Sequence, residues 1–318
     1  MVGSYGAGLT MRVTAVPQAG ETVAGATFSA GAGGKGSNQA IGAARLGAEV
    51  RLLTAVGKDE FGAAARSLWR AEGVDESGVV TVDAATMVGV ILVESGGENR
   101  IIIAPGALDR LGPKHVDTFA ASIASAQLLM VCNEIPVATV VAALRTAHHH
   151  GVPALFNPAP ARDLPADARQ FVDYLTPNLG EARVLAGLDD TAGVSEILDR
   201  LRRMYTATIV LTAGADGAYV DEPSGARMHV DAIRPTSVVD TTGAGDAFNA
   251  ALAVALCRGE SPVAAAHFAA AAGAFSVSKH EATPGLPTPD DIRALLHASG
   301  RHPQPHPISN HKNHEDPT

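Results

Sequence analysis

Two rhythms of apolar and polar positions alternate along most of the chain. Short apolar runs of strand length are separated by alanine-rich stretches in which apolar residues recur at helical spacing. The expected strands are residues 50–56, 128–132, 152–157, 174–176 and 208–211. The expected helices are residues 37–46, 60–72, 137–149, 181–188 and 195–204. Strands that alternate with helices predict an α/β fold with a mostly parallel central sheet and helical crossovers.

Two segments, residues 9–29 and 88–104, break this alternation. The second holds a Ser-Gly-Gly-Glu-Asn turn between two β-rich arms, which is typical of a hairpin. Because both segments leave and re-enter the α/β pattern, we expect them to pair into a small β-sheet lid. The expected division is an α/β core of residues 1–10, 35–87 and 105–300, a lid of residues 11–34 and 88–104, and a polar, proline-rich, disordered tail at 301–318.

Length and composition narrow the class of protein. The 318 residues fit one large α/β domain with a smaller appendage. A net charge of −9 argues against a sequence-independent grip on nucleic acid or on an anionic membrane. No segment approaches the roughly 20 apolar residues of a membrane span, and Cys132 and Cys257 lack metal-ligand spacing, which predicts reduced thiols. We therefore expect a cytoplasmic protein with no nucleic-acid or membrane partner.

The most informative segment covers residues 238–249. A β-branched run gives way to a turn bracketed by Gly243 and Gly245, and apolar residues then recur at helical spacing until Gly259. Glycines at the start of a helix have no side chains to obstruct the backbone amides, which can then bind an anion. Asp246 in the first turn is either a favourable partner of the helix dipole or a general base that meets a hydroxyl attacking a phosphoryl group. The spacing alone leaves both open.

A second glycine-rich turn, at residues 31–40, runs into an alanine-rich helix. It reads Gly-Ala-Gly-Gly-Lys-Gly-Ser-Asn-Gln-Ala, which is neither a Walker A loop nor a dinucleotide fingerprint. A Rossmann dehydrogenase is therefore disfavoured, because it requires an early fingerprint with an acidic ribose partner.

These two motifs and three others between them resemble the PfkB-type carbohydrate kinases. The first signature is matched by Gly33-Gly34-Lys35-Gly36-Ser37-Asn38-Gln39-Ala40 and the second by Asp240-Thr241-Thr242-Gly243-Ala244-Gly245-Asp246. The intermediate motifs are Asn157-Pro158-Ala159-Pro160, Thr176-Pro177-Asn178 with Glu181, and Leu211-Thr212-Ala213-Gly214-Ala215-Asp216-Gly217-Ala218. The resemblance spans nearly the whole chain. It implies a ribokinase-like three-layer α/β/α domain with a β-sheet lid, ATP and Mg²⁺ as cofactors, a sugar whose primary hydroxyl receives the γ-phosphoryl group, and a homodimer formed through the lid.

By the same resemblance, Asp246 is the catalytic base, and the amides of Thr242, Gly243, Ala244 and Gly245 hold the charge of the transferring phosphoryl group. A catalytically silent sugar- or nucleotide-binding regulator is the less favoured alternative, since the carboxylate and both anion-site glycines are present.

The nucleotide side of the site follows from the intermediate motifs. Asn178 and Glu181 match an element that acts on the phosphates and, through water, on Mg²⁺. Their spacing is also that of a helix-capping box, so this alternative stays open. The nucleotide-binding residues that the resemblance implies are Asn178, Thr212, Gly214, Gly217 and Gly245.

The sugar side departs from the family pattern. The resemblance places the sugar contacts at Gly34, Lys35, Asn38, Glu134 and Asp246. Where the family has an Asn-x-Asp pair after the first strand, this chain has Gly6 and Gly8. Losing the protein partner of a buried sugar hydroxyl typically weakens binding by about 1–3 kcal/mol, which disfavours tight binding of ribose. A kinase for a different sugar or for a nucleoside is therefore the alternative within the class.

A monovalent-cation site, for K⁺, is implied at Asp240 and Thr242 together with the loop of residues 278–285. Glu281 and Gly285 stand where the family has Gly and Ser. A carboxylate there would either strengthen cation binding or replace the ion with a salt bridge, and both alternatives stay open.

The beginning of the sequence is also unusual. Met1 and Val2 directly precede the Gly3-Ser4 pair, which leaves little of a first β-strand. We expect either a short central strand or a translation start that lies further upstream.

Overall fold

A seven-stranded sheet forms the centre of the protein in its computed structural model, which describes residues 1–96, 98–235, 237–298 and 306–307. The strand order is β15-β14-β13-β12-β11-β10-β9. The strands are β9 (Leu129–Cys132), β10 (Ala154–Asn157), β11 (Tyr174–Leu175), β12 (Thr208–Thr212), β13 (Ala218–Asp221), β14 (Arg227–Val230) and β15 (His306–Pro307). Strands β9 to β12 are parallel, and β12 to β15 are joined antiparallel. The mostly parallel α/β sheet is confirmed. Apart from β15, the tail expected at 301–318 lies outside the described residues.

Two separate pairs of short parallel strands lie beyond β9, and isolated bridges at Val2 connect this region to β9. β3 (Val50–Arg51) pairs with β5 (Val74–Asp75), and β4 (Ala55–Val56) pairs with β6 (Val80–Thr81). The single strand predicted over 50–56 is thus interrupted. Its backbone partner changes along the segment, because the Leu52 amide donates to Asp75 and the Leu53 amide to Met1.

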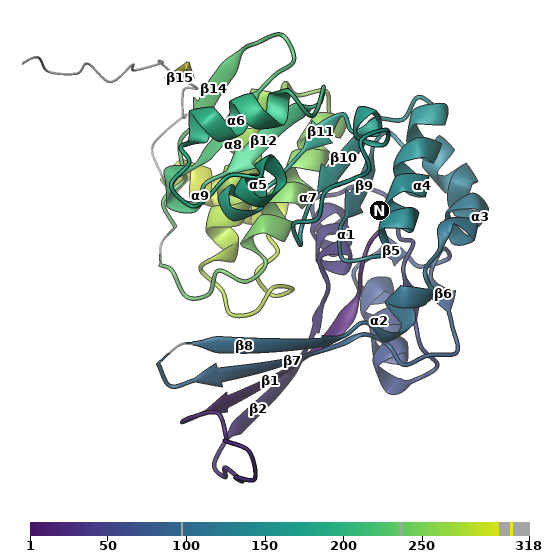
Figure 1. Ribbon diagram of the computed structural model, residues 1–318, viewed down its shortest axis with the longest axis vertical. Coiled ribbons are helices and arrows are strands. Elements are labelled where there is room, and N and C mark those ends of the chain that lie inside the picture. Colours follow the sequence, from purple (N-terminus) through teal and green to yellow (C-terminus); the bar gives the residue numbers. More distant parts are fainter. Residues whose placement is uncertain (97, 236, 299–305, 308–318) are drawn as a thin grey trace, which may run out of the picture.

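Helices cover both faces of the sheet, which gives three layers (Figure 1). One face carries α3 (Pro113–Ala124), α4 (Val137–His149), α5 (Leu179–Ala186) and α6 (Val194–Arg202). The other carries α1 (Lys35–Arg45), α2 (Glu60–Ala71), α7 (Ala244–Cys257), α8 (Pro262–Ser276) and α9 (Pro289–Ala298). The described residues also form the short 3-10 helices η1 (Gly106–Arg110), η2 (Arg169–Phe171) and η3 (Gly214–Asp216). No helix in the described ranges is long and apolar enough to cross a bilayer.

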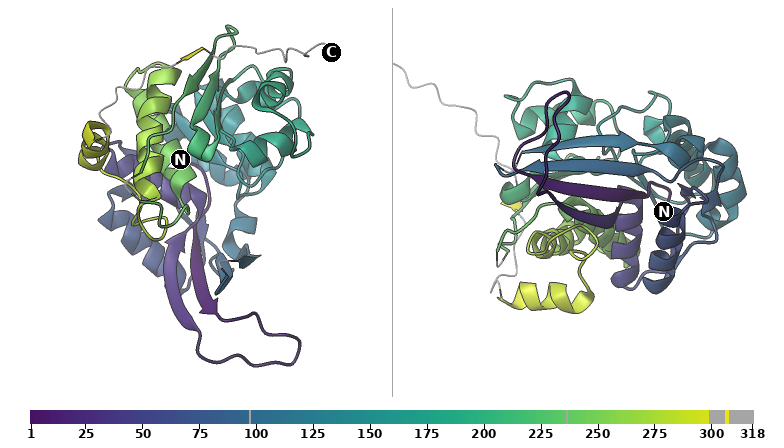
Figure 2. Two further views of the ribbon diagram at one scale, coloured as in Figure 1. Left: turned by 90° about the vertical axis from the view of Figure 1, so that its left-hand side faces the viewer. Right: turned by 90° about the horizontal axis from the view of Figure 1, so that it is seen from below.

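The lid is a four-stranded sheet that projects from one end of the core (Figures 1 and 2). Its order is β2-β1-β7-β8, with β1 (Gly6–Val13), β2 (Thr27–Gly33), β7 (Val88–Glu94) and β8 (Asn99–Ala104). The β7–β8 hairpin falls where the sequence predicted it. The first lid strand starts at Gly6 rather than at residue 11, because residues 6–12 form one continuous ladder with β2. Residues 6–10 therefore belong to the lid sheet and not to the core.

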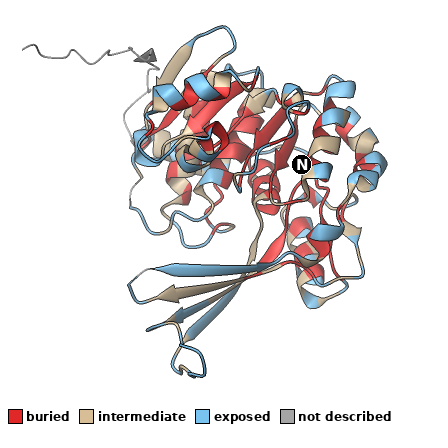
Figure 3. Cartoon of the chain, in the orientation of Figure 1, coloured by how far each residue is buried: buried red, intermediate tan, exposed pale blue. Residues whose placement is uncertain are grey.

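Burial falls off along the lid, whose far half is largely exposed (Figure 3). The core layers hold the large buried side chains, among them Trp69 and Tyr205. The indole nitrogen of Trp69 donates to the Ser37 hydroxyl at 2.8 Å, which ties α2 to the start of α1.

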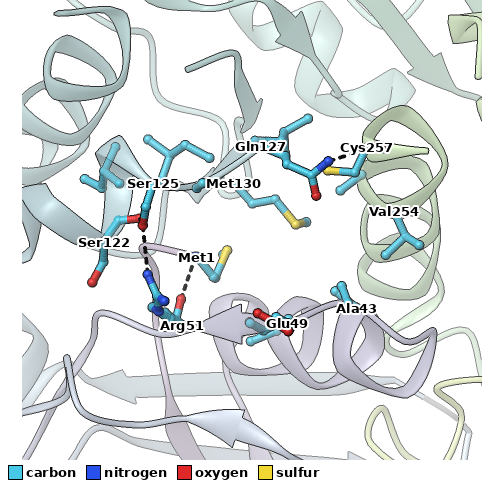
Figure 4. Close-up of a pocket in the computed structure, with 18 of the residues that line it drawn as sticks. Met1, Ala43, Glu49, Arg51, Ser122, Ser125, Gln127, Met130, Val254 and Cys257 are labelled. Carbon is cyan, nitrogen blue, oxygen red and sulfur yellow. Dashed lines mark hydrogen bonds between the residues drawn. The ribbon is translucent and has the colours of Figure 1, made fainter. Parts of the chain in front are cut away.

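The N-terminal residues lie at the junction of the two parts of the sheet. Val2 bridges Leu53 on one side and Val131 of β9 on the other. A cavity of about 540 Å³ adjoins Met1 between β3 and β9, and helices α1, α3 and α7 wall it (Figure 4). Its lining includes none of the site residues expected from the sequence. Isolated bridges at Val2 thus connect the two parts of the sheet.

Replacing Gly36 with alanine should destabilise the protein by about 1–3 kcal/mol. The new Cβ would lie 2.4 Å from the Ser4 backbone nitrogen and 2.6 Å from the Gly3 carbonyl carbon, and neither of these backbone atoms can move aside cheaply. Urea unfolding measures the effect. Gly112→Ala is the control, since no heavy atom lies within 4 Å of its Cβ position. Equal midpoints for the two variants would contradict the prediction.

Candidate active site

The first turn of α7 lies beside α1, so the two glycine motifs meet (Figure 1). Gly243 precedes α7 with φ 82°, a conformation that favours glycine. The amide of Ala244 donates to the Thr241 carbonyl at 3.3 Å, whereas the amides of Gly243 and Gly245 donate to no acceptor in the described part of the chain. Open amides at a helix N-terminus attract anions. The Thr242 amide donates to Asp240 Oδ1 at 2.9 Å, so two of the four amides expected to hold the phosphoryl group are available.

Asp246 is 6% exposed and is held by two amide side chains from α1. Asn38 Nδ2 donates to Oδ2 at 2.9 Å, and Gln39 Nε2 donates to Oδ1 at 3.0 Å. Gln39 Nε2 also lies 3.2 Å from Asn157 Oδ1, and Asn157 in turn donates to the Thr176 carbonyl at 2.8 Å. Sequence reasoning missed Gln39 as a site residue, although a polar residue within an alanine-rich helix was a usable signal.

The electrostatics of the site centre on Lys35. Burial raises the pKa of Asp246 above its ordinary value, and the positive charge of Lys35 and the two amide hydrogen bonds offset only part of that rise. Burial lowers the pKa of the Lys35 ammonium, but the charges of Asp246, Glu134 and Glu181 outweigh it, so the net shift is upward. Lys35 therefore stays protonated, and Asp246 is a stronger base than an exposed carboxylate.

Glu134 fixes the loop before α1. Its Oε2 accepts a hydrogen bond from the Lys35 amide at 2.8 Å and another from the Ser4 hydroxyl. Gly34 has φ 90°, and a Cβ there would lie 2.6 Å from the Tyr5 Cα, so the loop passes close to the lid's base. Oε2 therefore positions this loop, and the predicted contact between Glu134 and a sugar stays a prediction.

Asn178 and Glu181 form a reciprocal capping box at the start of α5. Asn178 Oδ1 accepts from the Glu181 amide, and Glu181 Oε2 accepts from the Asn178 amide, both at 2.8 Å. The capping alternative from the sequence is therefore realised. Burial raises the pKa of Glu181, and the charge of Lys35 opposes that rise while Asp246 adds to it. The Glu181 carboxylate thus also lies within electrostatic reach of the base.

The expected nucleotide loop follows β12. Thr212 ends that strand and bridges Asn178, which brings the loop next to the start of α5. Gly214 and Gly217 both have positive φ, 59° and 86°. A Cβ on Gly217 would lie 2.1 Å from the Val230 carbonyl oxygen, so that glycine is required by packing. The Cβ position of Gly214 has no heavy atom within 4 Å, which leaves room for a ligand.

The loop after α8 packs against the start of α7, where a Cβ on Gly243 would lie 2.7 Å from the Ala282 Cβ. Asp240 accepts hydrogen bonds from the amides of Thr242 at 2.9 Å and Glu281 at 3.1 Å. Burial raises the pKa of Asp240, but these hydrogen bonds outweigh it and the net shift is downward. A Cβ on Gly285 would lie 2.9 Å from the Ser276 hydroxyl. Within the described residues, no group of three His, Cys, Asp or Glu side chains could hold a metal on its own.

The two glycines that replace the polar pair differ in their surroundings. A Cβ on Gly6 would lie 2.7 Å from the Met87 methyl carbon, so Met87 already fills that space. A Cβ on Gly8 would meet nothing closer than the Gly31 carbonyl oxygen at 3.7 Å. Of these two glycines, only Gly8 has open space at its Cβ position.

A buried carboxylate beside open amides at a helix N-terminus is an arrangement suited to a phosphotransferase that acts on a small hydroxyl compound. Residues 2–289 match the model of the pfkB family carbohydrate kinases. The chain therefore belongs to the pfkB family, and it is an ATP-dependent sugar kinase.

Three relatives show how far the likeness extends. Ribokinase of Bacillus subtilis (strain 168) is 37% identical over 298 residues, covering 93% of this chain and 98% of the relative. Deoxyribokinase of Salmonella typhi is 31% identical, and the match covers 93% of this chain and 97% of the relative. The structure of Arabidopsis thaliana ribokinase complexed with ribose and ATP superposes with a TM-score of 0.88 at 29% identity, covering 93% and 97%. The ribokinase-like α/β fold with its lid is confirmed.

Gly245→Ala should separate stability from catalysis. No heavy atom lies within 4 Å of its Cβ position, and its φ is not positive, so alanine should stabilise α7 by up to about 1 kcal/mol. The methyl group would nevertheless occupy the space through which a phosphoryl group approaches the amides. We expect kcat/KM to fall at least about tenfold, as for the loss of one oxyanion donor. Thermal unfolding and ADP release measure the two effects, and unchanged kinetics would refute the role of this amide.

Proposed function

We propose that the protein transfers the γ-phosphoryl group of ATP to the primary hydroxyl of ribose and so produces ribose 5-phosphate. The observation that carries the proposal is the Asp246 carboxylate, buried beside open helix amides and held by Asn38 and Gln39. Relatives that bear the name ribokinase match over more than nine-tenths of the chain, which supports ribose as the sugar.

Asp246 takes the proton of the attacking hydroxyl, and its raised pKa makes it a better acceptor for that proton. The amides of Gly243 and Gly245 stabilise charge on the transferring group, and the Lys35 ammonium adds positive charge beside it. Because phosphoryl transfer needs mainly alignment and electrostatic stabilisation, these groups suffice for the protein's part.

The residues present fit the two cations that we propose. Glu181 keeps Oε1 outside the capping box, so Glu181 and Asn178 would hold Mg²⁺ through water, and Mg²⁺ supplies charge neutralisation to the phosphates. Asp240 accepts two amides, but a carboxylate has about four acceptor sites, so Asp240 and Thr242 retain oxygens for K⁺.

A different sugar or a nucleoside is the second candidate substrate. The open space at Gly8 favours it, since no β1 side chain grips the sugar from that strand. One relative is named deoxyribokinase, which agrees with a substrate that differs from ribose at one hydroxyl. A panel of pentoses, hexoses and nucleosides, compared by kcat/KM, distinguishes the two candidates.

We also propose a homodimer formed through the lid. Phe28, Met11 and Leu92 lie opposite one another on neighbouring lid strands, on the face away from Gly6 and Gly8. Phe28 is 64% exposed and Ile102, on the same face, is 65% exposed. Clustered apolar side chains of this size typically mark a protein interface.

The free Cys132 and Cys257 favour a reducing compartment, which we propose is the cytoplasm.

Asp246→Asn should lower turnover by several orders of magnitude and leave ATP binding intact, because only the proton acceptor is lost. ADP release with ribose, ATP and Mg²⁺ measures turnover, and calorimetry measures ATP binding. A non-catalytic regulator would show no sugar-dependent ADP release in the wild type either.

The pH profile gives the same prediction a second readout. The base works deprotonated and its pKa is raised, so kcat/KM of the wild type should decline with falling pH at values above the ordinary titration of an aspartate. A profile that stays flat down to the range of an exposed aspartate would contradict the assignment.

Phe28→Glu should convert the dimer to the 32.4 kDa monomer, because a charge would be buried in the proposed interface. Thr27→Glu serves as the control, because it places the same charge on the adjacent residue of β2, which points to the opposite face of the lid. Sedimentation equilibrium decides: equal masses for both variants would refute this interface.

A further inference from the structure

One face of the lid is bare at its base. Gly6 pairs with Gly33, and Gly8 pairs with Gly31. Cross-strand partners place their side chains on the same face, and alternate residues share a face, so all four glycines lie on one side. The register puts Ala7 and Ala32 on the opposite side. Near the core, β1 and β2 therefore offer no side chain to a bound sugar.

Glu281 reaches this bare face from the core. Its Oε2 lies 3.4 Å from the position that a Cβ on Gly31 would take. Two residues further along the same loop, the Thr283 hydroxyl lies 3.5 Å from Asn38 Oδ1, and Asn38 binds the catalytic base. The Glu281 carboxylate therefore stands at the edge of the space between the base and the lid.

The backbone at Glu281 is held in a conformation that glycine would adopt more readily. Its φ is 65°, and no other non-glycine residue in the described part of the chain has a positive φ. Its amide donates to Asp240, which fixes the turn. Its carboxylate is exposed and makes no hydrogen bond or ion pair with any described residue. Strain of this kind gathers at ligand-binding positions.

We propose that Glu281 determines which sugar is bound, by accepting hydrogen bonds from sugar hydroxyls on the lid side. This carboxylate takes over the task that no side chain of Gly6 or Gly8 performs. It enters from the loop after α8 instead of from β1, so it approaches the hydroxyls from a different direction. The inference rests on the proposed sugar kinase function and names the residue that selects among sugars.

The test compares the full-length wild type with Glu281→Gln and Glu281→Gly. The glutamine keeps the size and the backbone conformation but loses the charge, whereas the glycine also relieves the positive φ and should fold at least as well. We expect both to raise the sugar KM about 10- to 100-fold, as for the loss of a hydrogen bond to a charged group, with the ATP KM within about twofold. Glu260→Gln, an exposed carboxylate just beyond α7, should leave both constants unchanged.

A rescue variant sharpens the test. The Cβ position of Gly8 is open to 3.7 Å, so Gly8→Asp places a carboxylate on the same face from β1. Added to Glu281→Gln, it should recover part of the sugar affinity and change the order of preference among ribose, 2-deoxyribose and hexoses. A merely structural role for Glu281 would show no such change of preference.

The outcomes separate the inference from the function on which it rests. A sugar KM within twofold of the wild type in Glu281→Gln overturns the inference while the kinase function stands. A higher K⁺ requirement with an unchanged sugar KM also overturns it, since the carboxylate would then serve the cation. Wild-type protein that binds sugar by calorimetry through Glu281 but releases no ADP would refute the kinase function alone.

Discussion

The approach of α1 to α7 is the constraint on which the active site depends. A buried carboxylate is stable only with hydrogen-bond partners, and both partners of Asp246 come from α1. The helices come this close because their facing residues are small: a Cβ on Gly42 would lie 2.8 Å from the Ala250 Cβ. The same packing places Lys35 beside the base. A larger residue in this contact would therefore loosen the base and the charge that balances it.

The glycines of the site serve different physical needs. Gly36 lets two backbones cross, and Gly243 supplies a positive φ before α7. Gly245 has neither reason, and its open Cβ position borders the amides that we propose for phosphoryl binding. The lid glycines leave one face without side chains near the core, and the Glu281 carboxylate lies against that face.

Local patterns predicted the elements better than their partners. The helix expected over 137–149 is α4, Val137–His149. The strand expected over 50–56 is interrupted, and the lid begins at Gly6 instead of residue 11, because both depend on which distant strand supplies the hydrogen bonds. The Asn-x-x-Glu spacing fitted two roles, and the capping geometry appeared only with the backbone of α5 in place. Gln39 was missed because its partner is remote in sequence.

The sequence by itself determined the α/β alternation, the inserted lid and the two glycine motifs, since periodicity and backbone freedom are local properties. Only the tertiary structure decided which side chains share the site. It brought Gln39 to Asp246, turned Glu134 Oε2 toward the loop before α1 and filled the space at Gly6 with Met87. It also set Glu281 against the lid. Each of these contacts joins residues far apart in the chain, and packing, not spacing, fixes such distances.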